Sequence, residues 1–410
     1  MTQLHGHTND IALRARAQRV VPGGMYGHLS ATPMGPDYPQ YIASAKGCRI
    51  RDVDGNEYID FMCAFGPNLL GYGHPGVEAA AALQRAEGDT MTGPSPRMVE
   101  LAEAFVDMVD HADWVLFAKN GTDATTVCLN VARAATGKRV VLRARGAYHG
   151  AAPWSTPVKD GILREARAHV LRFDYNDIAS LEKAVDEAGT DLAAILVTAF
   201  KHETYQDQEL PTLAFARRAR ELCDKHGAAL IVDDVRAGMR VTHGCSWETL
   251  GVNPDLSAWS KAVGNGHPIA MVAGSDSLRD AGGRVFATGS FWFSAVPMAA
   301  AIATIDIARK ERVVEHMQAM GTLLREGIAR QATAHGFRLR QSGPPQMPQM
   351  LFDDDPKVEL GTRWTGAVAR RGVYLHPYHN MFLCAAHTEA DIRQALDATE
   401  EAFAELARAR

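Results

Sequence analysis

The sequence has few cysteines, and none stands at a spacing typical of a metal site or a redox motif. Its 410 residues include six cysteines, with no CxxC pair and no zinc-ligand spacing. This argues against a zinc module and a disulfide framework, and it predicts reduced thiols in the core, as in cytoplasmic proteins. His376, His379 and His387 also lack metal spacings, so we expect no bound metal. The cysteines are Cys48, Cys63, Cys128, Cys223, Cys245 and Cys384.

Long apolar runs and blocks of one charge are also absent. No stretch approaches the roughly 20 apolar residues of a membrane-spanning helix, and residues 1–20 lack the apolar core of a secretory signal. The net charge of −5 is spread along the chain, which gives no electrostatic basis for binding nucleic acid or an anionic membrane surface. We therefore expect a cytoplasmic protein whose partners are small molecules.

No G-x-G-x-x-G follows any predicted strand, which argues against dinucleotide binding. From Trp114 to Gly274, short apolar runs instead alternate with helical patterns such as residues 213–226. This alternation predicts an α/β fold in which helices flank both faces of a mostly parallel, seven-stranded sheet. The strand candidates are WVLF, RVVLRA, HVLRF, AAILVTA, ALIVDD, LSAWS and IAMVAG.

The length permits one large domain and a smaller one. We predict an N-terminal segment, residues 1–60, that packs with a C-terminal α+β domain, residues 306–410, and a large domain at residues 61–305. The segment contains a helical pattern at 11–19 and the short strands CRIRDVDG and EYIDFM. The large domain also has helical patterns from Pro75, at 96–110 and after Pro297. The C-terminal domain mixes helices at 314–335 and 389–408 with the strands FRLRQSG, QMLFD, VYLHP and MFLCAA.

The stretch AALIVDDV, residues 228–235, carries the main functional signal. A short apolar run that ends in two acids predicts a buried parallel strand, with Asp233 pointing into the crevice where such sheets bind ligands. The two-residue period of a strand places Val235 on the side of Asp233, and Asp234 and Arg236 on the other side. Lys261 ends the next apolar run and precedes a loop of small residues.

An acid and a lysine at neighbouring strand ends are what pyridoxal phosphate (PLP) requires. The lysine amine forms a Schiff base with the cofactor aldehyde, and the carboxylate keeps the pyridine nitrogen protonated. The alternatives are a buried Asp233 paired with an unrelated cation and a solvated surface Lys261.

Two further strand ends carry candidate ligands. Gly121 and Thr122 begin a helix after WVLF, where backbone N–H groups and a hydroxyl can hold a phosphate; an ordinary helix cap is the alternative. Tyr148 and His149 end another strand, and Tyr148 can stack on a flat ring or simply be a half-buried tyrosine.

Together these motifs resemble the class III PLP-dependent aminotransferases of fold type I, especially the glutamate-1-semialdehyde aminomutase branch. The resemblance spans nearly the whole chain. It is carried by VPGG, RDVDGNEYIDF, GPNLLGYGHP, NGTDA, GAYHG, VDDVRAGMR, SKAVGNGHP, GVYLHP and AAHT.

The resemblance implies specific roles for residues of this chain. Lys261 is the expected Schiff-base lysine and Asp233 the expected partner of the pyridinium nitrogen. Cofactor binding is also expected from Gly121, Thr122, Tyr148, His149 and Val235. In this family a glycine–threonine pair from the partner subunit completes the phosphate site, and Gly289 and Ser290 stand there, which implies a homodimer with a shared active site.

Departures from the family pattern bear on the substrate. Ser30 stands where the aminomutases carry an arginine for the substrate carboxylate, and Thr198-Ala199-Phe200 replaces the usual acid–proline pair. Losing the arginine removes a bidentate anchor, so a donor without a nearby carboxylate is favoured. Strings such as VPGGMYGH, GDTMTGPS and HPYHNMFL are similar to the bacterial fumonisin aminotransferase subgroup, whose donors are long-chain amino alcohols and whose acceptor is pyruvate.

We therefore expect a transaminase that moves an amino group from an aliphatic amine or amino alcohol to a keto acid such as pyruvate. Tyr26, His28, Phe65 and Trp292 are predicted to line the donor pocket, although packing also explains the aromatic cluster around Trp292. The alternatives are an aminomutase or amino-acid racemase, and a non-catalytic PLP-binding protein.

Overall fold

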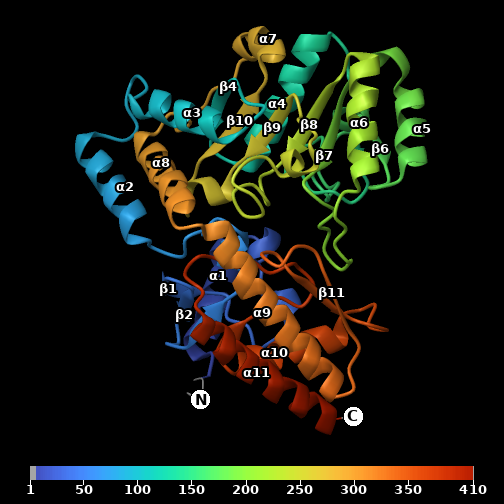
Figure 1. Ribbon diagram of the computed structural model, residues 1–410. Helices are drawn as coiled ribbons and strands as arrows, with labels where there is room; N and C mark the ends of the chain where they lie inside the picture. Colours follow the sequence, from blue (N-terminus) through green and yellow to red (C-terminus); the bar gives the residue numbers. More distant parts are fainter. Residues whose placement is uncertain (1–5, 410) are drawn as a thin grey trace.

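The computed structural model describes residues 6–409 and has two lobes (Figure 1). One lobe is built on a seven-stranded sheet of order β4-β10-β9-β8-β7-β5-β6. The pairs from β9 to β6 are parallel, and β10 runs antiparallel to both its neighbours. The strands are β4 (Trp114–Ala118), β5 (Val140–Ala144), β6 (Val170–Phe173), β7 (Leu192–Thr198), β8 (Ala229–Asp233), β9 (Leu256–Trp259) and β10 (Ala270–Gly274). The predicted mostly parallel, seven-stranded α/β sheet is confirmed.

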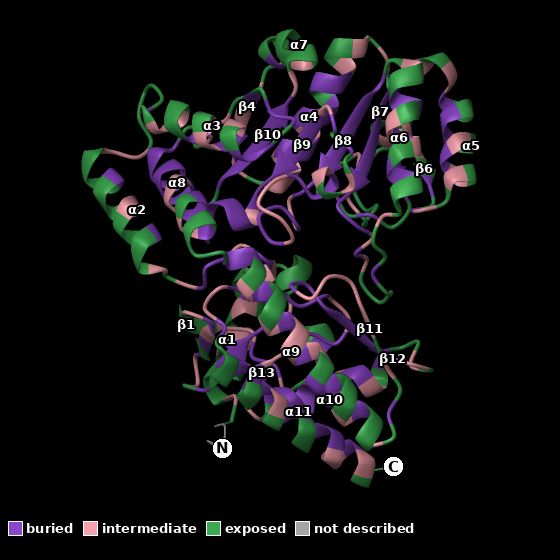
Figure 2. Ribbon diagram, viewed as in Figure 1, coloured by how far each residue is buried: buried purple, intermediate pink, exposed green. Residues whose placement is uncertain are grey.

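Alternate residues of the central strand β8 pack into two different cores. Ile231 lies in the cluster that includes Val127 and Val131 of α4, whereas Leu230 and Val232 lie in the cluster formed with α5 and α6. Strands covered on both faces consist mostly of apolar residues, and Figure 2 shows that the strands of this sheet are largely buried. The flanking helices of this lobe are α2 (Pro75–Glu87), α3 (Arg97–Met108), α4 (Gly121–Thr136), α5 (Ile178–Ala188), α6 (Leu213–His226), α7 (Arg279–Arg284) and α8 (Ala295–Lys310).

The other lobe joins the two ends of the chain (Figure 1). β13 pairs in parallel with β3, so a strand from the last forty residues completes the sheet β1-β2-β3-β13. Its strands are β1 (Ile42–Lys46), β2 (Arg49–Asp52), β3 (Glu57–Asp60) and β13 (Val373–Tyr374), and β11 (Leu339–Ser342) with β12 (Gln349–Phe352) forms a separate hairpin. Its helices are α1 (Thr8–Val20), α9 (Val313–Ala334), α10 (Glu359–Ala369) and α11 (Glu389–Arg408).

The domain division stays a prediction. β3 ends at Asp60, and its pairing with β13 brings residues 1–60 beside the C-terminal region. The predicted boundary at residue 305 falls inside α8, which ends at Lys310. Across residues 6–409, no helix combines the length and the apolar character needed to cross a membrane.

Two local expectations differ from the structure. The predicted strand MFLCAA is wrong, because no continuous ladder forms there. The N–H groups of residues 381–383 and 385 donate by turns to residues 346–348 and residues 61–69, and the N–H of Cys384 donates to His387 Nδ1. The sequence does not predict β1, because its residues are all exposed and lack the alternation that marks a half-buried strand.

Candidate active site

The carboxylate of Asp233 is fixed by two neighbours at the end of β8. Its Oδ2 atom lies 2.7 Å from His149 Nδ1, and its Oδ1 accepts a hydrogen bond of 3.1 Å from the backbone N–H of Val235. Both Asp233 and His149 are buried, and His149 Nε2 has no hydrogen-bond partner in the described chain. An imidazole that donates from Nδ1 to the carboxylate holds it in one orientation.

Lys261 follows β9, the parallel neighbour of β8, in an unusual backbone conformation. Its φ is 48°, in the left-handed region that side chains other than glycine seldom adopt. Hydrogen bonds fix both ends of the loop at residues 260–265 that contains Lys261. Ser260 Oγ donates to Ile269 O at 2.8 Å, and Asn265 Oδ1 accepts from Leu70 N at 2.7 Å. This backbone conformation directs the lysine side chain into the cavity that Asp233 also lines.

The amine of Lys261 titrates far below its ordinary range. Burial, then the nearby charge of Arg236, lowers its pKa to about 7, although Asp233 acts in the opposite direction. A large fraction of the amine is therefore neutral at neutral pH, which is the nucleophilic form that an aldehyde requires.

The N-terminus of α4 lines the same cavity as Lys261. Asn120 N donates to Asp123 Oδ2 at 2.9 Å and so begins the helix, while the first N–H groups of the helix, from Gly121 and Thr122, have no intrahelical partner. A Cβ on Gly121 would stand 2.7 Å from Val235 Cγ1, so only glycine lets the helix approach β8 this closely. The free donors and the Thr122 hydroxyl suit a phosphate.

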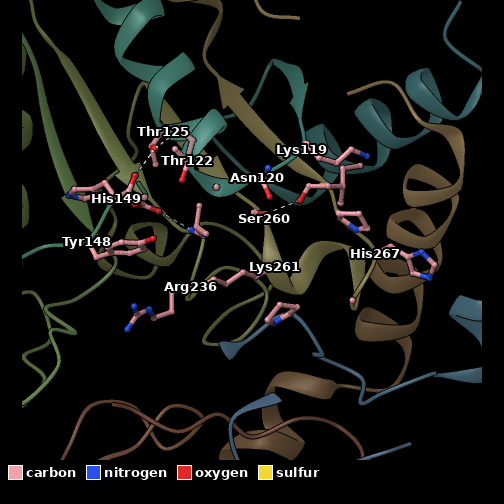
Figure 3. Close-up of a pocket in the computed structure, with 18 of the residues that line it drawn as sticks. Lys119, Asn120, Thr122, Thr125, Tyr148, His149, Arg236, Ser260, Lys261 and His267 are labelled. Atoms are coloured by element: carbon pink, nitrogen blue, oxygen red, sulfur yellow. Dashed lines mark hydrogen bonds and ion pairs between the residues drawn. The ribbon is translucent and has the colours of Figure 1, made fainter. Parts of the chain in front are cut away.

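All these groups border one cavity of about 290 Å³, drawn in Figure 3. Seven predicted site residues line it: Gly121, Thr122, Tyr148, His149, Asp233, Val235 and Lys261. The residues fit pyridoxal phosphate, since the cavity offers N–H donors for its phosphate, a carboxylate for its ring nitrogen and an amine for its aldehyde. Tyr148 is 44% exposed, so its ring is free to pack on a ligand.

The other predicted residues lie outside this cavity. His28 and Phe65 pack edge to face with ring centroids 4.8 Å apart and line a second cavity of about 440 Å³. Tyr26 is 71% exposed, and Trp292 packs partly against the core around α4. Gly289 and Ser290 do not line the Lys261 cavity either. The roles predicted for these residues therefore remain predictions.

Some cavity residues were not among the predicted ligands. Lys119, His202 and Ser260 follow β4, β7 and β9, and all three line the cavity. Burial, then the charge of Arg236, lowers the pKa of His202 well below its ordinary value. Since the ends of parallel strands meet at one edge, listing every polar residue just after a strand would have found them.

Two groups of possible metal ligands come together without any sequence spacing to signal them. One is Cys63, Cys384 and His387, and the other is His111, Cys245 and Glu248. None of these residues lines the Lys261 cavity.

Comparison with known proteins agrees with this geometry. The family model described as aminotransferase class-III matches residues 33–403. The chain is 54% identical over 396 residues to aminopentol aminotransferase of Sphingopyxis macrogoltabida, covering 97% of this chain and 94% of that protein. It is 31% identical to glutamate-1-semialdehyde 2,1-aminomutase of Symbiobacterium thermophilum, covering 97% and 98%.

A solved structure extends the likeness to the fold. The PLP internal aldimine form of the FumI protein from Sphingopyxis sp. MTA144 matches with a TM-score of 0.97 and 54% identity. The match covers 98% of this chain and 97% of that one.

Proposed function

This chain belongs to the class-III aminotransferase family and is a pyridoxal-phosphate-dependent transaminase; from that premise we propose that its donor is an aliphatic amine or amino alcohol without a nearby carboxylate, and its acceptor a keto acid such as pyruvate. The observation that carries the donor assignment is Ser30, which stands where the aminomutases carry a carboxylate-binding arginine. The name of the 54% identical relative, an aminopentol aminotransferase, describes an amine with several hydroxyl groups and supports the same class.

The residues of the cavity have distinct tasks in this reaction. Bound pyridoxal phosphate supplies an aldehyde that takes up the amino group and a ring that delocalises the electrons released at the donor carbon. Lys261 Nζ, once free, takes the proton from the amine-bearing carbon and returns it as general acid. Asp233, whose carboxylate is oriented by His149, would hold the proton of the ring nitrogen. Gly121 and Thr122 would hold the phosphate, and Val235 would lie against the ring.

A second cavity supports an aliphatic donor. It is lined mostly by apolar side chains, among them Met34, Ile50 and Phe65, together with His28. Partial burial, then the charges of Lys261 and Arg236, lowers the pKa of His28, so this residue lies within electrostatic reach of the active site. An alkyl chain attached to an amine at Lys261 gains free energy by entering such a space, at about 0.8 kcal/mol for each CH₂ buried.

The proposed enzyme is a homodimer with shared active sites, working in the cytoplasm. Gly289 and Ser290 lie outside the cavity of their own chain, and Ser290 is exposed, which leaves it free to reach a partner. Six buried cysteines without disulfides suit a reducing compartment.

Product analysis tests the proposal against an aminomutase or racemase, the alternative that the 31% identical relative favours. The purified protein is given primary amines of increasing chain length, with and without pyruvate. With pyruvate we expect continued turnover to a ketone or aldehyde and an equal amount of alanine, at a rate that rises with chain length. Without pyruvate, the reaction should stop after one equivalent of ketone or aldehyde per active site. Turnover of an amino acid or amino aldehyde to its isomer without any keto acid would contradict the proposal and support the alternative.

A further inference from the structure

Arg236 is a cation that the chain holds at the active site without an acidic partner. It lines the same cavity as Lys261 and is only partly exposed. Its Nη1 donates to His202 O at 3.1 Å and to Asn380 Oδ1 at 2.9 Å. In residues 6–409 its other two guanidinium nitrogens make no hydrogen bond, and no carboxylate lies within ion-pair distance.

The two bonds hold one nitrogen of the Arg236 guanidinium. Both acceptors bind the same nitrogen, and Asn380 is itself buried and donates to Met381 O at 2.8 Å. The guanidinium is therefore held from one side, while Nε and Nη2 remain available to a ligand. Two such N–H groups form a fork that matches the two oxygens of a carboxylate.

The charge of Arg236 also favours binding of an anion. Burial lowers the pKa of Arg236 to about 10, which leaves it charged at neutral pH, and Asp233 and Tyr148 act in the opposite direction. Burial is the main cause of the lowered pKa values of Lys261, His28, His202 and His379, and the charge of Arg236 lowers all four further. A buried cation without a partner is costly, so binding an anion here is favourable.

We propose that Arg236 binds the carboxylate of the keto acid acceptor, an inference that rests on the transaminase function proposed above. The donor has no carboxylate near its amine, so this cation serves the second half of the reaction only. The acceptor then sits with its carboxylate on Arg236 and its carbonyl carbon toward Lys261, and the rest of the cavity is left to the donor.

Other assignments fit less well. The cofactor phosphate has its donors on α4, and Figure 3 shows Thr122 and Asn120 on one side of Lys261 and Arg236 on the other. Arg240 is fully buried, and its guanidinium is occupied by Gly66 O, Leu383 O and the Phe382 ring. It does not line the cavity.

The test compares two acceptors in R236Q, R236K and the unmodified enzyme. Glutamine keeps a donor for His202 O but lacks the charged fork. For pyruvate we expect the KM of R236Q to rise roughly 10–100-fold, as loss of charge-assisted hydrogen bonds predicts, with R236K in between. For an acceptor aldehyde without a carboxylate, the KM should be the same in the three proteins. R340Q, at an exposed arginine paired with Asp207 and Asp353, is the matched control and should behave as the unmodified enzyme.

Two readouts separate binding from a merely structural role. Lactate, a non-reacting analogue of pyruvate, should bind the cofactor-loaded enzyme in calorimetry and bind R236Q at least about tenfold more weakly. In the cofactor-free protein, the pKa of Lys261 should rise in R236Q. Equal losses with pyruvate and the aldehyde, or lactate binding that R236Q leaves unchanged, would overturn the inference. If the unmodified enzyme fails to aminate any keto acid, the proposed function fails instead.

Discussion

Lys261 and Asp233 reach one cavity from adjacent strands, and neighbouring side chains set the charge state of Lys261 and the orientation of Asp233. The Asp233 carboxylate is ordered by His149, and the Lys261 amine is kept partly neutral by burial and by Arg236. At the scale of single residues, the chemistry thus rests on a small set of contacts between side chains that are far apart in the sequence.

Replacing Asp233 tests its contact with the ring nitrogen. D233N keeps the size of the side chain but removes the charge, so we expect kcat to fall roughly 100-fold or more, as measured by alanine formation from pyruvate. The control is D234N, at the next residue on the opposite side of β8, where Asp234 Oδ2 accepts from Ser246 N. D234N should affect stability more than kcat; equal losses of kcat in both variants would contradict the assigned role.

The pKa of Lys261 predicts how cofactor uptake depends on pH. Because only the neutral amine attacks an aldehyde, and the pKa is lowered to about 7, the rate at which cofactor-free protein captures pyridoxal phosphate should rise about tenfold per pH unit below pH 7 and level off above it. The measurement is the growth of visible absorbance after mixing. N-acetyl-lysine is the reference amine, and its rate of reaction should reach half of its maximum at about pH 10.4. The same high midpoint in the protein would show that burial does not shift Lys261.

The sequence predicted the residues of the site better than their partners. Asp233 and Lys261 were found because each ends an apolar run, and that position is encoded locally. The contact of Asp233 with His149, 84 residues away, depends on how the strands pack. Strand periodicity also did not predict that Nε and Nη2 of Arg236 lack hydrogen-bond partners among residues 6–409, since it places Arg236 on the side opposite Asp233 and says nothing of the turn that follows β8.

At the scale of elements, the close approach of α4 to β8 creates the phosphate site. The Asn120–Asp123 pair begins the helix, and Gly121 lets it lie against Val235. The boundaries of such regular elements follow from apolar periodicity, so α6 and α11 have the predicted bounds. Residues 381–383 and 385 do not follow this periodicity, because their N–H groups donate to two remote segments that no local pattern identifies.

A methyl group at residue 121 should disturb this packing. In G121A the new Cβ would meet Val235 Cγ1 at 2.7 Å, so either α4 or Val235 must shift. We expect the affinity for pyridoxal phosphate, measured by equilibrium dialysis, to fall about tenfold, as for loss of one hydrogen bond to a charged group. In G283A the Cβ meets nothing within 4 Å, and the affinity should stay unchanged. Undiminished affinity in G121A would argue against α4 as the phosphate site.

At the scale of the whole molecule, each chain is proposed to complete its partner's site through Gly289 and Ser290. The prediction is complementation between two inactive variants. K261A lacks the lysine, and S290D puts a negative charge beside the expected phosphate. After the two proteins are unfolded together and refolded, mixed dimers carry one intact site, so about one quarter of the unmodified activity should return.

Each variant refolded alone is the control and should stay inactive. Full activity of S290D alone, or no recovery in the mixture while K261A and S290D form mixed dimers, would contradict a shared site. To interpret an absence of recovery, the mixed dimers must be shown directly, for example by isolating them with two different affinity tags.

The visible spectrum of the purified enzyme during one cycle shows whether transamination proceeds through Lys261. A long-chain amine added alone should abolish the absorbance band of the lysine-bound cofactor, and pyruvate added afterwards should restore it with release of alanine. K261A should show neither a starting band of this kind nor the cycle. Loss and return of the band in K261A with the unmodified enzyme's rates, or a band in the unmodified enzyme that the amine leaves unchanged, would contradict transamination through Lys261.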